Sequence, residues 1–112
     1  MPGEPKYETT RVNNALMNTK RYLGGAHKSC DTTQRACLTH LKGDIEAAED
    51  RVQAHALLLA FVNRTENYTA RVILPSTIET KLTEHETTLR QALEAAGKVY
   101  ALWGGRSMHF WG

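Results

Sequence analysis

Apolar residues recur at alternating spacings of three and four in two long stretches of the chain. The first pattern comprises Leu38, Leu41, Ile45, Ala48, Val52, His55, Leu59 and Val62. The second comprises Ile78, Leu82, His85, Leu89, Ala92, Ala96, Val99 and Trp103. This spacing places each set on one face of an α-helix and is typical of a coiled-coil seam. The pattern therefore predicts two long helices, over residues 31–62 and 76–103.

The two apolar faces fit together in an antiparallel helical hairpin. Residues that face each other then have position numbers that sum to 140 or 141 along the whole length of the seam. This register places His55 opposite His85, the two polar residues of the pattern. We interpret the two histidines as a polar layer that fixes the register, as single polar seam residues do in coiled coils.

Capping residues support the predicted starts of both long helices. Asp31 is followed three positions later by Gln34, and Ser76 is followed three positions later by Glu79, directly after Pro75. An oxygen acceptor followed at this distance by Glu or Gln is the pattern of a capping box, in which the two side chains satisfy free backbone N–H groups. Each long helix is therefore expected to begin at such a box.

A shorter helix is expected near the N-terminus. Residues 1–8 form an extended lead-in rich in proline, and residues 9–23 carry an apolar face that ends before Gly24 and Gly25. A long loop, residues 63–75, joins the two long helices, and residues 104–112 form an aromatic tail. The predicted fold is a single all-α domain over residues 1–112, with three helices and a coiled-coil-like seam.

Composition and charge limit the classes of function. The chain has 112 residues and a net charge of +2, which predicts no nucleic-acid partner. Its most apolar run, residues 57–62, is far shorter than the roughly 20 residues that a membrane span needs. The N-terminus lacks the charged and apolar regions of a signal peptide. We therefore expect an intracellular protein without a transmembrane segment, with a mitochondrial complex as one candidate location.

The two cysteines are expected to be free thiols in the core. Cys30 and Cys37 are seven positions apart, which corresponds to about 10 Å along a helix. A disulfide needs Cα atoms within about 7 Å of each other. A bridge would require Cys30 to lie in a loop that bends back toward Cys37.

No pattern of catalytic or metal-binding residues stands out. His55 and His85 could together ligate zinc with Glu84 or Glu86 nearby, but their neighbours in the seam supply no third and fourth ligand. A nucleophile next to a base and a glycine-rich phosphate loop are also missing from the sequence. We therefore expect a non-enzymatic protein with no metal, no cofactor and no small-molecule substrate.

The remaining apolar residues suggest a surface that binds other protein subunits. A two-helix hairpin leaves Leu58 and Leu93 beside its seam, and the loop and the tail carry further apolar groups. The predicted partner-binding residues are Leu58, Val72, Ile73, Leu74, Leu93, Met108, Phe110 and Trp111.

We therefore expect a structural or interaction protein, an accessory subunit of a larger complex. One alternative is a stand-alone binding or inhibitor protein of viral or phage type. Another is a surface glycoprotein that uses the glycosylation sequons at Asn63 and Asn67, which the missing signal peptide instead marks as accidental.

Overall fold

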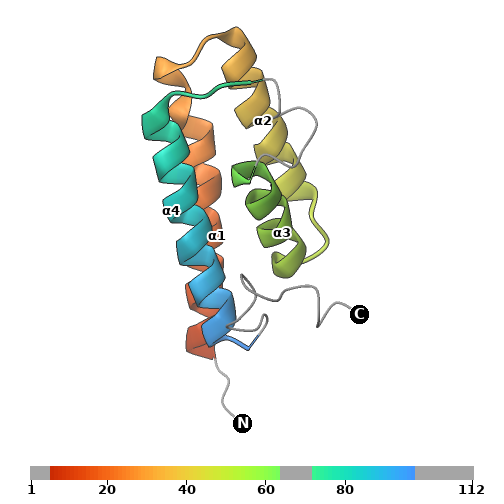
Figure 1. Ribbon diagram of the computed structural model, residues 1–112. Coiled ribbons are helices and arrows are strands. Elements are labelled where there is room, and N and C mark those ends of the chain that lie inside the picture. The colour runs from red at the N-terminus through yellow and green to blue at the C-terminus, as the bar shows by residue number, and fades with distance from the viewer. Residues whose placement is uncertain (1–5, 64–71, 98–112) are drawn as a thin grey trace.

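The computed structural model describes residues 6–63 and 72–97, and this part of the chain is all-helical without strands (Figure 1). It contains four α-helices and one short 3₁₀ turn. The α-helices are α1 (Lys6–Gly25), α2 (Thr32–Ala47), α3 (Arg51–Val62) and α4 (Ser76–Ala95), and the 3₁₀ turn η1 (Ala26–Ser29) joins α1 to α2. The predicted all-α class is confirmed, and the predicted number of helices is wrong.

Consecutive helices run in alternating directions and form a four-helix bundle (Figure 1). Helix α1 contacts α2 and α4, and α3 likewise contacts α2 and α4. Helix α3 has 12 residues and is the shortest of the four. Helices of this kind each bury one apolar face, so an antiparallel bundle is a favourable arrangement.

The predicted helix over residues 31–62 is interrupted between Ala47 and Arg51. Ala48 has an extended backbone, with φ −63° and ψ 145°, and Asp50 is the N-cap of a new helix. The Asp50 side chain accepts a hydrogen bond of 2.8 Å from the backbone N–H of Gln53. Helix α3 therefore folds back along α2 and does not continue it.

The apolar periodicity concealed this break because it runs through residues 48–52 without a glycine or proline. The capping pattern, however, was present: Asp50 precedes Gln53 by three positions, just as Asp31 precedes Gln34. The Asp31 box itself is confirmed, with both of its side chain to backbone hydrogen bonds formed. This second Asp-x-x-Gln pattern, inside a periodic stretch, was the signal for a second helix, although the Gln53 side chain accepts from the backbone N–H of Glu49 and not of Asp50.

The other helix ends also differ from the prediction. Helix α1 begins at Lys6 and reaches Gly25, so it is longer than the predicted helix over residues 9–23. Helix α4 ends at Ala95, where Gly97 adopts a left-handed conformation with φ +74° that terminates the helix. The predicted helix is therefore wrong for Ala96 and Gly97. Residues 98–103 of the predicted helix and the predicted tail, residues 104–112, lie outside the described residues.

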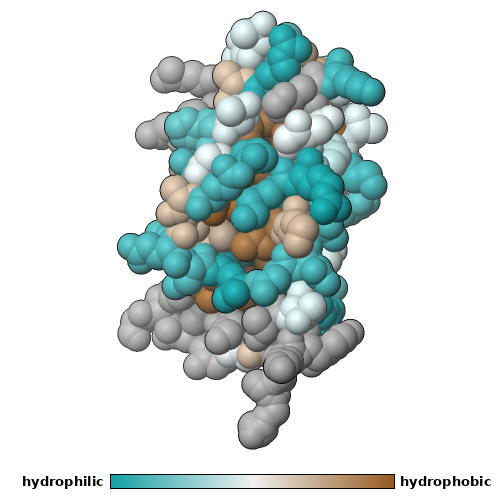
Figure 2. Space-filling model, turned by 180° about the vertical axis from the view of Figure 1, so that it is seen from behind, coloured by the Kyte–Doolittle hydropathy of each residue, from teal (hydrophilic) through white to brown (hydrophobic). Residues whose placement is uncertain are grey.

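The apolar positions identified from the sequence do form the core. Leu38, Leu41 and Ile45 of α2 are at most 3% exposed, although they now pack in a four-helix core and not in a two-helix seam. Cys30 and Cys37 are both buried and are not joined by a disulfide, as expected. The surface seen from behind is mainly hydrophilic, with small apolar patches between the polar side chains (Figure 2).

None of the helices described here is long and apolar enough to cross a membrane.

Candidate functional site

The predicted partner-binding residues fall into three groups in the structure. Leu58 of α3 and Leu93 of α4 are completely buried, so their assignment to a binding surface is wrong. The prediction assumed a two-helix hairpin with exposed flanks, whereas a bundle of four helices covers both flanks. Met108, Phe110 and Trp111 lie outside the described residues, and the predictions for them stay predictions.

The third group is the extended segment that leads into α4. Val72 is half-buried and Leu74 is buried, while Ile73 between them is 79% exposed. The amide Nε2 of Gln34, on the first turn of α2, donates a hydrogen bond of 2.7 Å to the carbonyl oxygen of Ile73. The segment is therefore held across the bundle between α2 and the start of α4 (Figure 1). The Ile73 side chain faces solvent.

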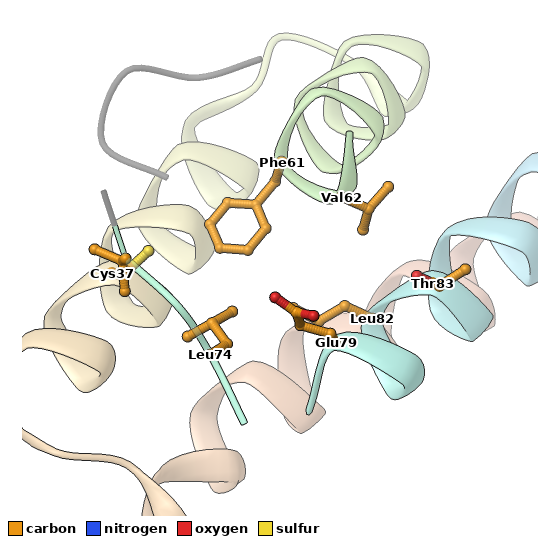
Figure 3. Close-up of a pocket in the computed structure, with 8 residues that line it drawn as sticks. Cys37, Phe61, Val62, Leu74, Glu79, Leu82 and Thr83 are labelled. Atoms are coloured by element: carbon orange, nitrogen blue, oxygen red, sulfur yellow. The ribbon is translucent and has the colours of Figure 1, made fainter. Parts of the chain in front are cut away.

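A cavity of about 110 Å³ lies beside this segment, where α3 ends and α4 begins (Figure 3). Its lining comprises Cys37, Phe61, Val62, Val72, Leu74, Glu79, Leu82 and Thr83. Most of these side chains are apolar, and Phe61, Leu74 and Leu82 are at most 6% exposed. A small cavity is therefore present at this end of the bundle.

Glu79 brings a carboxylate into this apolar environment. Its side chain is directed into the space between Phe61, Val62 and Leu74 (Figure 3). The sequence predicted that Glu79 would instead close a capping box with Ser76. That box does not form, because Pro75 is the N-cap of α4 and provides no side-chain hydrogen bond to the helix. Glu79 is thus directed to the cavity.

The predicted histidine layer is replaced by a buried acid–base cluster. His55 Nε2 lies 2.8 Å from Glu86 Oε2, and Arg90 Nε donates a hydrogen bond of 3.1 Å to the same oxygen. His55 and Glu86 are 1% and 4% exposed. Burial raises the pKa of Glu86, but hydrogen bonding with His55 and Arg90 and the charge of both groups outweigh it, so the pKa lies below its usual value.

His85 is turned toward α1 and packs against Tyr22, with ring centroids 5.2 Å apart. Burial, with a smaller contribution from the charge of Lys81, lowers the pKa of His85, while the charge of Glu84 opposes this shift. His85 is half-buried. The prediction of a His55–His85 pair is therefore wrong, because the actual partner of His55 is Glu86, one position further along α4.

The sequence pattern did not reveal the contacts of two acidic residues. Glu86 was not assigned to the seam, although its spacing of four from Arg90 is that of a helical ion pair. Glu79 was assigned to capping. Within residues 6–63 and 72–97, no three His, Cys, Asp or Glu side chains are placed to hold one metal ion.

The His55–Glu86 contact is in the core, whereas the cavity and Ile73 are at the surface at one end of the bundle. Comparison of the chain with protein-family models, with curated protein sequences and with solved structures found no match.

Proposed function

We propose that this chain is a non-catalytic interaction protein, an accessory subunit that docks onto another protein through the surface around Ile73. The observation that carries the proposal is the 79% exposure of Ile73 in a segment whose neighbours on both sides pack on the bundle. Met17, the other large apolar residue exposed in the described part of the chain, is 47% exposed on α1.

The energetics of the segment favour its use in binding. Complete burial of an isoleucine side chain contributes about 1.5–3 kcal/mol. The backbone around Ile73 is already held by the hydrogen bond from Gln34 and by the buried Leu74 side chain. Because little additional chain has to be ordered on binding, less of this contribution is lost to conformational entropy.

The ionisable clusters support a binding role over a catalytic one. The His55–Glu86 contact is enclosed in the core, where a substrate cannot reach it. His40 and Asp44 form a surface pair, 3.4 Å apart, of a kind common on exposed helices. Accessory subunits of organellar membrane complexes, including mitochondrial ones, provide a suitable setting for such a protein.

Affinity capture with two matched variants tests the proposal. Ile73→Asp places a charge in the proposed interface, and Met17→Asp places the same charge on α1. We expect the parent chain and Met17→Asp to retain a partner in fixed stoichiometry, and Ile73→Asp to lose it by a factor of at least about 30, which corresponds to the 2 kcal/mol of an important interface residue.

Circular dichroism of both variants serves as the control for folding. Retention of the partner by a folded Ile73→Asp variant would show that the surface is wrong. A chain that is monomeric or dimeric by itself, with no stoichiometric partner, would contradict the accessory-subunit role and favour a stand-alone binding protein.

A further inference from the structure

The cavity beside the end of α3 has a wall made mostly of apolar side chains. Phe61 and Val62 line it from α3, Leu82 lines it from α4, and Leu74 lines it from the segment that leads into α4 (Figure 3). Phe61, Leu74 and Leu82 are at most 6% exposed, so the bundle holds them in place. Pockets that bind small molecules have this composition, with an apolar lining and a few polar groups that orient the ligand.

The Thr83 hydroxyl is the polar group that a ligand in this cavity meets at the surface. Thr83 lines the cavity from α4 and is exposed, so the cavity reaches solvent beside it. A hydroxyl both donates and accepts hydrogen bonds, and a second hydroxyl satisfies both roles. Glu79 also lines the cavity, but it already has an interaction partner within the protein. No ligand contact is therefore assigned to its carboxylate.

We propose that this cavity binds a compact branched alcohol of about four to six carbons, with its hydrocarbon part among Phe61, Leu74 and Leu82. The hydroxyl of the alcohol lies at the mouth of the cavity and bonds to Thr83. Apolar cavities of about 150 Å³ take up benzene from water. A cavity of about 110 Å³ therefore holds a slightly smaller hydrocarbon group, such as the branched end of isopentanol. A larger group would have to displace the buried Phe61 or Leu82 side chain.

The expected affinity follows from the hydrocarbon that the cavity removes from water. Each buried methylene group contributes about a factor of four to a binding constant. Five carbons therefore contribute about a factor of one thousand, which corresponds to a dissociation constant of about 1 mM. The hydrogen bond to Thr83 adds to this affinity, and the freedom of motion that the ligand loses reduces it. The dissociation constant is therefore expected in the millimolar range.

This inference does not depend on docking through Ile73. Ile73 does not line the cavity, and a small alcohol can enter without a protein partner. The experiment below uses only the isolated chain, so its failure leaves the proposed function open to its own test. The expectation that the protein has no small-molecule substrate is not affected, because binding here involves no reaction.

An NMR titration of the full chain with isopentanol tests the proposal. We expect chemical-shift changes at Phe61, Leu74 and Leu82 that saturate in the millimolar range. Isopropanol has a shorter hydrocarbon part, by two carbons, and should bind about 15-fold more weakly. Adamantanol has a cage too large for the cavity and should cause no shifts at these residues. Tighter binding of adamantanol than of isopentanol would indicate association with the protein surface and would overturn the proposal.

Variants in matched pairs locate the binding. Thr83→Val removes the hydroxyl and should weaken isopentanol by a factor of about two to ten, whereas Thr80→Val, at an exposed position of α4 outside the cavity, should not weaken it. Val62→Leu adds a methylene group to the lining and should weaken isopentanol about fourfold or more. Val52→Leu adds the same group at a half-buried position of α3 outside the cavity and should have no effect. The NMR spectrum of each variant without ligand serves as the control for folding.

The cysteines provide a second measurement of occupancy. Cys37 lines the cavity, whereas Cys30 lies outside it and donates a hydrogen bond to the carbonyl oxygen of Ala26. Saturating isopentanol should slow the reaction of a small thiol reagent with Cys37 and not with Cys30. The proposal is overturned by an absence of shifts at about 50 mM isopentanol, far above the expected dissociation constant. Folded Val62→Leu and Thr83→Val variants that bind isopentanol as tightly as the parent would overturn it as well.

Discussion

Replacing either member of the His55–Glu86 pair with leucine should destabilise the protein more than replacing both. His55→Leu leaves the Glu86 carboxylate, 4% exposed, with Arg90 as its remaining hydrogen-bond partner of those the structure describes around it. Glu86→Leu removes the oxygen that both His55 Nε2 and Arg90 Nε contact. The double variant removes both polar groups and puts two apolar side chains in contact across α3 and α4.

The expected magnitudes follow from the burial of the pair. Breaking a buried ion pair by removing one partner costs about 3–5 kcal/mol when the other charge stays buried without compensation. Arg90 still pairs with Glu86 in His55→Leu, so the loss in that variant is expected below this range. Leucine at both positions is expected to be within about 1 kcal/mol of the parent, since well-packed apolar replacements of such pairs are often neutral or stabilising. The coupling energy of the double-mutant cycle should therefore be at least about 2 kcal/mol.

Urea unfolding monitored by circular dichroism measures all four proteins of the cycle. Acidification gives a second measurement. The pKa of Glu86 is lower when the protein is folded than its ordinary value of 4.5, so the stabilisation is present above that value and is lost as the pH falls through the folded pKa. The double variant should lack this part of the acid sensitivity. Additive single-variant effects would refute the reasoning.

The remaining predictions concern His85 and two glycines. Burial lowers the pKa of His85 below 6.5, so protonation favours the unfolded chain: stability should fall as the pH drops below 6.5 and the full loss should appear below the folded pKa. His85→Gln should remove this loss between pH 6.5 and the folded pKa in urea titrations at several pH values, and an unchanged pH profile would contradict it. Gly97→Ala should lower the free energy of unfolding by about 1 kcal/mol, because φ is +74° there. Gly43 lies inside α2, with no atom within 4 Å of an added Cβ, so Gly43→Ala should raise the free energy of unfolding by up to about 1 kcal/mol. Thermal unfolding of both variants measures these changes. A stabilised Gly97→Ala together with a destabilised Gly43→Ala would contradict them.

The sequence predicted the composition of the core better than the path of the chain. Leu38, Leu82 and Leu89 were assigned to an apolar face from their spacing, and all three are at most 1% exposed. Periodicity shows that a position faces a core, but it does not show which helix lies opposite. The same leucines satisfy a two-helix seam and a four-helix bundle equally well.

The interruption at Ala48 decided between these two arrangements. The Asp50 cap marks the point where α2 has ended and α3 begins. In the sequence, one Asp–Gln pair is the sign of this break, and no glycine or proline accompanies it. The folding back of α3 then covered Leu58 and Leu93. A local hydrogen bond thus changed two predicted surface residues into core residues.

The candidate site was only partly predictable for a similar reason. Ile73 was identified as a docking residue, and the structure shows it exposed. The role of Glu79 depended on the choice between Pro75 and Ser76 as N-cap, which one residue of shift reverses. The His55–Glu86 contact depended on a small rotation of α4 that periodicity alone does not fix.

The central claim, docking through Ile73, is tested most directly by site-specific photo-crosslinking. A p-benzoylphenylalanine residue is placed at the position of Ile73 or, as the control, of Met17, and each protein is irradiated together with the captured partner. We predict a crosslink in good yield from position 73 and little or none from position 17. A crosslink from position 17 alone, with both proteins folded, would contradict the account.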